Sequence, residues 1–257
     1  AVVRDAHVVV VGDEVEDVLL EVGAGAGDEM DLVLRDHLGE RQAEFGGALR
    51  FETGSVVDGQ NGWDWAQAAI ARLSAMDNVR VLSRTTAFGY YAQNFVGLVE
   101  RVTDHVQNPH PGLPRERLWQ VRAKRVFISN GANQPHMGFA YNYRPGVMLA
   151  SAARAYLNHY GVAVGRNVGV YTANDSAYAA AIDLKKAGVN IAAIVDLRDN
   201  PAGSIIDEAR SLGIEVHGGR AVVRVGGKLR VSSMTVQPKN GGGERTIPVD
   251  AVLMSAG

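Results

Sequence analysis

Hydrophobic residues fall into two alternating patterns along this chain. The segment His7–Val11 is a β-branched run that ends at Gly12, which is typical of a buried parallel strand. Residues 13–22 then place apolar side chains at helical spacing, and Asp31–Arg35 is expected to form the next strand. A strand, a turn and a helix in this order predict the start of an α/β fold.

The middle of the chain changes period and predicts a small antiparallel sheet. Trp63–Met76 spaces its apolar residues as a helix does, and the strand Val79–Leu82 follows it. Further strands are expected at Thr86–Tyr91, Phe95–Val102, Leu118–Arg122 and Arg125–Ser129. The Pro- and Gly-containing segment His105–Pro114 is expected to be a hairpin tip.

The second half of the chain starts the alternation of strand and helix again. The predicted helices are Val147–Tyr160, Ser176–Ala187 and Ser204–Leu212. The predicted strands are Asn167–Tyr171, Ile191–Asp196, Ile214–His217 and Ala251–Met254, with two short strands near 220–225 and 229–237 around Gly226-Gly227. This alternation predicts a doubly wound parallel sheet.

Together these patterns predict an α/β protein with two doubly wound units, one interrupted by the other, and a small antiparallel β insertion. The first domain, with the insertion, is expected over residues 1–144, and the second over 145–250. Residues 251–257 are expected to form a strand that returns to the first domain.

Composition removes several classes of function. The 257 residues include no cysteine, which excludes a dithiol redox pair, a thiolate nucleophile and cysteine-ligated metal within this sequence. Residues 1–40 carry a net charge of −9 and the remainder +7, without the concentrated basic face that nucleic acid requires. No apolar stretch approaches a membrane span, so a cytoplasmic location is expected. The histidines are dispersed, and no metal site or catalytic residue is predicted.

A dinucleotide site needs a glycine-rich turn after the first strand and an acid about 20 residues later. Gly12 stands where the first glycine belongs, but Glu14 and Asp17 occupy the positions of the second and third. Carboxylates there would block close approach of the backbone and repel a pyrophosphate. Asp36 or Glu40 lies at a suitable distance to bind ribose hydroxyls.

The second unit has the opposite defect. Its strand runs into Thr172-Ala173-Asn174-Asp175-Ser176, which contains no glycine, while Asp196 closes the next strand 24 residues after Thr172. Asp175 or Ser176 is best interpreted as a helix N-cap, which would use the backbone donors that a phosphate needs. A nucleotide site here is therefore the weaker interpretation.

Two blocks of sequence carry a family resemblance. Residues 84–105 (RTTAFGYYAQNFVGLVERVTDH) and 118–184, with the phrases RPGVMLASA, YLNHYGV and ANDSAYAAAIDL, resemble the FAD/NAD(P)-binding region of the alpha subunit of heterotetrameric sarcosine oxidase. With QAEFGG and the terminal SAG, the similarity extends over most of residues 42–257. Related modules occur in amino-acid dehydrogenase and hydrogen cyanide synthase subunits.

The resemblance implies two interleaved dinucleotide-binding, Rossmann-like domains. In such an arrangement the first domain holds NAD and flavins serve oxidative demethylation of sarcosine, with substrate oxidised in a partner subunit. The resemblance also implies that this chain is a fragment of a longer subunit. Gly46-Gly47 matches the family's glycine pair, with Glu40-Arg41 at its acid-acid pair, and Gly131 matches a strand-end glycine. The family's Gly-x-Gly-Pro-Ala-Gly turn is replaced here by the acidic residues after Gly12.

The leading hypothesis is a dinucleotide-binding module of a sarcosine-oxidase-like alpha subunit that binds NAD, or alternatively FAD, and assembles with the other subunits of an amine oxidase. Its candidate cofactor-binding residues are Gly12, Asp36, Glu40, Arg41, Gly46, Gly47, Thr86, Gly131 and Gly257. One rival is a scaffold whose nucleotide site has degenerated. Others are an amino-acid dehydrogenase or hydrogen cyanide synthase subunit and, least favoured, a free-standing NADH-dependent flavoprotein reductase.

Overall fold

A computed structural model describes residues 2–3, 8–11, 31–34, 45–128 and 134–256 of the chain. The candidate residues Gly12, Asp36, Glu40, Arg41, Gly131 and Gly257 lie outside the described residues, as does the helix predicted over 13–22. The chain divides into two compact units, residues 1–132 and 133–257. Each unit is described by itself.

The first unit contains a parallel sheet with strand order β10-β3-β2-β6. Its strands are β2 (Val8–Val11), β3 (Asp31–Leu34), β6 (Val79–Leu82) and β10 (Arg125–Ile128). Every neighbouring pair is parallel, with Val10 of β2 between Val33 of β3 and Val81 of β6. The four strands predicted from apolar runs in this part of the chain are confirmed.

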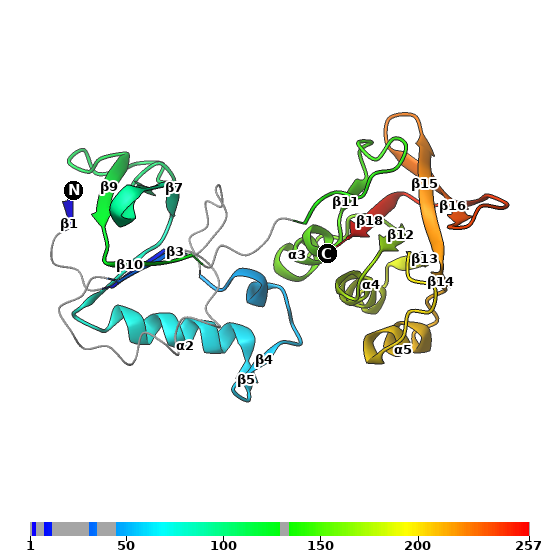
Figure 1. The fold of residues 1–257 in the computed structure, drawn as a ribbon, viewed down its shortest axis with the longest axis horizontal. Coiled ribbons are helices and arrows are strands. Elements are labelled where there is room, and N and C mark those ends of the chain that lie inside the picture. Colours follow the sequence, from blue (N-terminus) through cyan, green and yellow to red (C-terminus); the bar gives the residue numbers. More distant parts are fainter. Residues whose placement is uncertain (1, 4–7, 12–30, 35–44, 129–133, 257) are drawn as a thin grey trace. The chain divides into compact units, whose positions relative to one another are not determined.

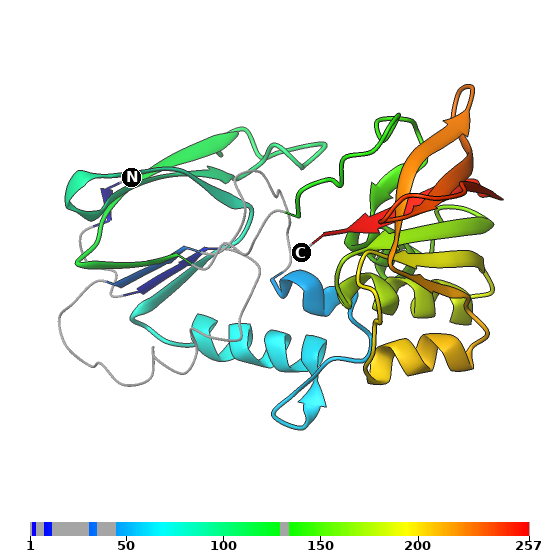
Figure 2. The same ribbon diagram turned by 45° about the vertical axis from the view of Figure 1, so that its right-hand side comes forward.

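The helix α2 (Gly62–Ser74) lies on one side of this sheet (Figure 2). It begins at Asn61, whose side-chain oxygen accepts hydrogen bonds from the backbone amides of Trp63 and Asp64. Its buried residues are Gly62, Trp65, Ala66, Ala69 and Leu73, which recur at helical spacing. The helix predicted over 63–76 is therefore present with slightly different ends.

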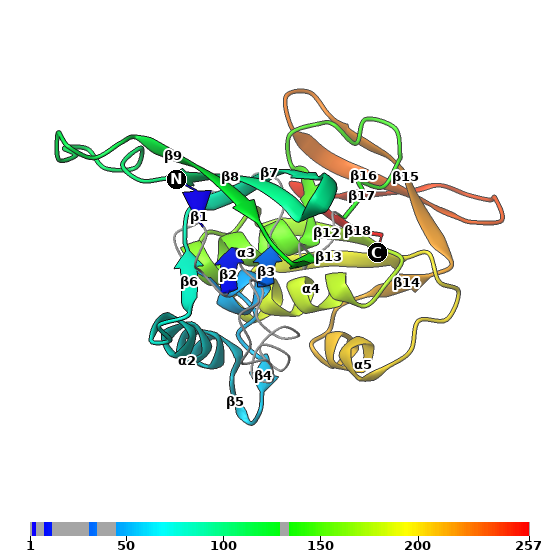
Figure 3. The ribbon, with the colours of Figure 1, turned by 60° about the vertical axis from the view of Figure 1, so that its left-hand side comes forward.

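A mixed sheet, antiparallel except where β1 pairs in parallel with β9, lies on the other side of the parallel sheet (Figure 2). It has the order β1-β9-β8-β7, with β1 (Val2–Val3), β7 (Thr85–Tyr91), β8 (Phe95–Arg101) and β9 (Glu116–Arg122). β8 and β9 form a long hairpin whose tip includes the predicted loop 105–114 (Figure 3). Short elements that the sequence did not predict are η1 (Gly47–Arg50), β4 (Val56–Val57), β5 (Gln60–Asn61) and η2 (Ala92–Asn94).

The second unit is built on a five-stranded parallel sheet with the order β11-β18-β12-β13-β14. The strands are β11 (Val147–Leu149), β12 (Asn167–Thr172), β13 (Asn190–Asp196), β14 (Val216–Gly218) and β18 (Ala251–Ser255). Helices α3 (Ala150–Tyr160), α4 (Ser176–Lys186) and α5 (Ser204–Ser211) cover one face (Figure 1). This arrangement is the parallel α/β sheet predicted for this half.

A three-stranded antiparallel sheet covers the other face of the second unit (Figure 1). Its strands are β15 (Arg220–Gly227), β16 (Val231–Pro238) and β17 (Arg245–Pro248), in that order. Met234 of β16 is fully buried in the core that this sheet shares with β12, β13 and β18. The hairpin expected around Gly226-Gly227 is present, although Gly227 still pairs with Val231 and the turn follows it.

Two features differ from the sequence-based expectation. Val147–Leu149 begins as the strand β11 because it pairs with β18, and the helix starts only at Ala150. The strand 251–255 lies between β11 and β12 in the second unit, where a return to the first domain was expected. Val252 and Leu253 are fully buried, since this strand is covered on both faces, as central parallel strands are.

Residues 134–144, which the sequence assigned to the first domain, lie with the second unit. Met137 belongs to the core beneath the three-stranded sheet, and Ala140 bridges to Arg224 of β15. None of the helices among the described residues is long and apolar enough to cross a membrane.

Candidate functional site

In the first unit, the glycine pair Gly46-Gly47 forms a turn immediately before η1. Both residues have positive φ angles, 130° and 48°, a region that favours glycine. A Cβ atom on Gly46 would lie 3.0 Å from Cζ3 of the Trp63 ring. The Gln67 amide nitrogen donates to the Phe45 carbonyl at 3.1 Å, so α2 holds this turn in place from two positions.

Arg50 ends η1 and reaches back toward the glycine pair. Its Cγ atom lies 3.5 Å from the position that a Cβ on Gly46 would take. The Nε atom is buried and has no hydrogen-bond partner. A buried, unpaired guanidinium nitrogen next to a bare glycine backbone fits an anionic group such as a dinucleotide phosphate.

Thr86, the third predicted site residue that the structure describes, lies in β7 opposite Val99 of β8. It therefore stands on a different element from Gly46 and Gly47, and its place in the candidate site stays a prediction. Arg50 was missed because an arginine three residues beyond a glycine pair has no signal of its own in one sequence.

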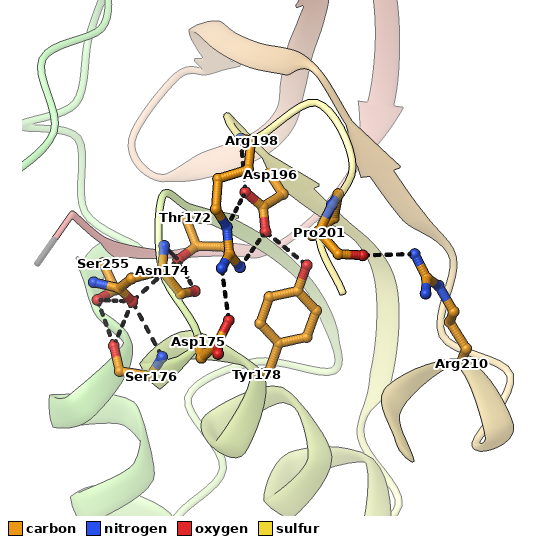
Figure 4. Close-up of polar contacts among 10 residues, drawn as sticks. All are labelled: Thr172, Asn174, Asp175, Ser176, Tyr178, Asp196, Arg198, Pro201, Arg210 and Ser255. Carbon is orange, nitrogen blue, oxygen red and sulfur yellow. Dashed lines mark hydrogen bonds and ion pairs between the residues drawn. The ribbon is translucent and has the colours of Figure 1, made fainter. Parts of the chain in front are cut away.

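The second unit presents polar side chains where three parallel strands end (Figure 4). Thr172 ends β12, Asp196 ends β13 and Ser255 ends β18, and all three are completely buried. In parallel α/β sheets, ligands bind at the carboxyl ends of the strands. This is therefore the position at which the fold would hold a nucleotide.

The side chain of Asn174 fills the turn between β12 and α4. Its Oδ1 atom accepts the Ser176 backbone amide at 3.1 Å, the Ser176 hydroxyl at 2.7 Å and the Ser255 hydroxyl at 3.2 Å. The sequence predicted Asp175 or Ser176 as the N-cap of this helix. Asp175 occupies the N-cap position, but its side chain makes no capping hydrogen bond. Asn174 caps the helix, so one amide donor that a phosphate would use is already taken.

Asp196, the acid at ribose-binding distance along the sequence, is also engaged. Its Oδ1 accepts from the Arg198 backbone amide at 2.9 Å and from Arg198 Nε at 3.1 Å. Its Oδ2 accepts from Arg198 Nη2 at 2.8 Å and from the Tyr178 hydroxyl at 2.8 Å (Figure 4). A carboxylate has about four lone-pair positions, so no acceptor remains for ribose hydroxyls.

The electrostatics of this cluster strengthen its internal pairing. Hydrogen bonding to Asp196, and less strongly to Asp175, raises the pKa of the Arg198 guanidinium. Burial is the main cause of the raised pKa of Tyr178, and the hydrogen bond to Asp196 adds to it. Arg198 Nη1 also bonds Asp175 at 2.7 Å, which ties the start of α4 to the segment after β13.

The second unit thus does not fit a dinucleotide as it stands. Its turn contains no glycine, its capping amide is used by Asn174 and its buried acid is fully paired by Arg198 and Tyr178. The sequence analysis identified Asp196 and the capped turn but missed Arg198. A cation two residues after the acid was the available signal for this pairing.

The fold of the chain is similar to that of several solved oxidoreductases. Thioredoxin reductase from T. acidophilum matches 99% of this chain and 77% of its own, with a TM-score of 0.68 and 16% identity. L-proline dehydrogenase from P. horikoshii matches the whole chain and 42% of its own, with a TM-score of 0.59 and 20% identity. The predicted α/β fold of the FAD/NAD(P)-binding oxidoreductases is confirmed.

The sequence itself has close curated relatives. The alpha subunit of sarcosine oxidase from Rhizobium meliloti (strain 1021) is 42% identical over 212 residues, which is 82% of this chain and 21% of that protein. The chain is related to sarcosine oxidase alpha subunits. The alpha subunit from Corynebacterium sp. (strain P-1) is 40% identical over 185 residues, 72% of this chain and 19% of its own. No family model matches the chain.

This similarity confirms the resemblance inferred from the two sequence blocks, and the relatives are subunits of an oxidoreductase. The chain spans about a fifth of the length of these sarcosine oxidase alpha subunits. The similarity therefore concerns one region of a much longer subunit.

Proposed function

We propose that this chain is the dinucleotide-binding part of the alpha subunit of a multi-subunit amine-oxidising flavoenzyme of the sarcosine oxidase type. The observation that carries the proposal is the 42% identity over 82% of the chain to a sarcosine oxidase alpha subunit. NAD is the proposed cofactor and FAD the alternative. Oxidation of the amine is assigned to a partner subunit, and the cytoplasmic location expected from the sequence stays a prediction.

We assign the dinucleotide to the first unit. The glycine turn at Gly46-Gly47 and the unpaired Nε of Arg50 support this assignment. The internal pairing of Asp196 in the second unit supports it as well, because that carboxylate has no free acceptor. When bound, the dinucleotide would supply the redox chemistry, whereas the residues of this chain bind and orient it.

In this proposal the role of each predicted residue follows from its chemical type. Gly12 lets the backbone approach the pyrophosphate, and Asp36 or Glu40 accepts hydrogen bonds from ribose hydroxyls. Gly46, Gly47 and Gly131 leave room for backbone contacts, with Arg41 and Thr86 as further binding residues. Gly257, also predicted as a binding residue, belongs to the second unit and has no role in this site. No residue of this chain is assigned a catalytic role.

The experiment is to purify the complete enzyme, denature it and identify the released nucleotides by absorbance and mass. NAD bound to the alpha subunit supports the proposal, and FAD there supports the alternative cofactor. An alpha subunit that releases no nucleotide, and takes up neither NAD nor FAD at saturating concentration, contradicts it.

A scaffold without a ligand is the second candidate, favoured by Glu14 and Asp17 at the glycine positions after Gly12. If this candidate is right, the wild-type enzyme is empty and the double variant Glu14→Gly/Asp17→Gly gains measurable affinity for NAD. Tight binding by the wild type excludes it. Steady-state oxidation of sarcosine compared with other amino acids by the complete enzyme distinguishes the sarcosine oxidase from the amino-acid dehydrogenase and hydrogen cyanide synthase types.

A further inference from the structure

Arg50 stands out among the described residues of the first unit because of an unpaired side-chain nitrogen. The Nε atom is buried without a hydrogen-bond partner, and no ion pair of Arg50 occurs within the described ranges. A buried charged donor without an acceptor is strongly unfavourable, so such a group in a native fold calls for a partner.

Acids close to Arg50 in the sequence are directed elsewhere. Glu52 Oε2 accepts the Ser55 hydroxyl at 2.8 Å, and Asp58 Oδ2 accepts the indole nitrogen of Trp65 at 3.2 Å. Each carboxylate thus accepts a hydrogen bond from a residue other than Arg50. The guanidinium is thus left available for an anion from outside this segment.

The position of Arg50 is set by the glycine turn. The Trp63 ring explains why residue 46 is glycine, since a Cβ there would lie 3.0 Å from the ring. Without side chains at 46 and 47, the arginine stem lies against bare backbone. The planar guanidinium at the end of this stem is suited to bind phosphate oxygens in a bidentate manner.

We propose that Arg50 is a phosphate-binding residue of the first unit and pairs with the diphosphate of the bound nucleotide. The inference rests on the proposed function and adds a residue to that same site. Its ligand class is a nucleoside diphosphate ester, in which the diphosphate, and not the base or ribose, contacts this side chain.

The test compares ADP with adenosine, which lacks the diphosphate, on the complete enzyme depleted of nucleotide. Dissociation constants are measured by calorimetry for the wild type, Arg50→Gln, Arg50→Lys and Arg72→Gln. Arg72 lies exposed on α2 of the same unit and is the matched control. Arg50→Gln is expected to weaken ADP binding by about tenfold or more and to leave adenosine binding unchanged.

Arg50→Lys should keep part of the ADP affinity, because lysine retains the charge but lacks the paired donors of the guanidinium. Arg72→Gln should bind ADP as the wild type does. Equal ADP affinity in Arg50→Gln and wild type overturns the inference alone. So does an equal loss for ADP and adenosine, which would indicate a purely structural residue. A wild-type enzyme that binds neither compound overturns the proposed function first, and this inference with it.

Discussion

The Tyr178 hydroxyl donates a 2.8 Å hydrogen bond to Asp196 Oδ2, and both side chains are fully excluded from solvent. This contact joins the first turn of α4 to the end of β13. In Tyr178→Phe the carboxylate loses one of its four donors while staying buried, so the free energy of unfolding should fall by about 1–3 kcal/mol. Urea denaturation followed by far-UV circular dichroism measures this loss.

A control separates this effect from changes elsewhere. Tyr160, at the exposed end of α3, is 63% accessible, and Tyr160→Phe should stay within about 0.5 kcal/mol of the wild type. All three tryptophans, Trp63, Trp65 and Trp119, lie in residues 1–132, so their fluorescence reports on the first unit. If the urea transition of Tyr178→Phe, followed by circular dichroism, is the same as that of the wild type, the expectation is wrong.

Arg198 supplies the counter-charge of the buried Asp196 through its guanidinium, and its backbone amide donates a further hydrogen bond. Replacing Arg198 with Met leaves the carboxylate buried without a counter-charge, and we expect a loss of about 3 kcal/mol in the free energy of unfolding. The double variant Arg198→Met/Asp196→Asn should recover a large part of that loss, because no buried charge remains. A double variant as unstable as Arg198→Met would show that packing, and not charge, is responsible.

The single variant Arg198→Met should also change its response to pH. Without Arg198, a proton on the carboxylate removes an uncompensated buried charge, so proton uptake should favour the folded variant over its unfolded chain. The deficit of the variant relative to wild type should therefore shrink as pH falls from 7 toward 4.5 and return as pH rises. Denaturation curves at several pH values check the sign.

His217 gives the wild type a pH dependence of the opposite sign. Burial is the main cause of its lowered pKa, Arg245 and Arg220 lower it further, and Glu215 opposes them. Because the unfolded chain takes up a proton more readily below about pH 6.5, stability should fall as pH drops from 7.5 to 5.5. His217→Gln should make this decline shallower, while His105→Gln, at an exposed position, should leave it unchanged.

The sequence predicts the second unit well because its strands and helices have strong local patterns. Residues 167–172 and 190–196 are almost uniformly apolar strands, and the helices between them have clear periodicity. The place of 251–255 could not be predicted in this way, since an apolar run does not specify which sheet it joins. The strand β11 was hidden because Val147–Leu149 also fits the helical period that continues after it.

The candidate site was harder to predict than the fold, for a physical reason. Whether Asp196 can bind a ribose depends on its contacts with Arg198 and Tyr178. These contacts form only in the folded structure and do not follow from residue spacing. Spacing alone correctly marked the strand end and the acid. It could not indicate that the acid is already saturated.

Ser176 provides a direct test of which unit holds the dinucleotide. In Ser176→Asp a carboxylate is placed at the first residue of α4, where it interacts favourably with the helix N-terminus and repels any phosphate. If the second unit binds no nucleotide, the nucleotide content of the complete enzyme should equal that of the wild type, whereas Arg50→Gln should reduce it. Loss of the nucleotide from Ser176→Asp would assign the binding to the second unit. The circular dichroism transition of the variant would establish that its fold is intact.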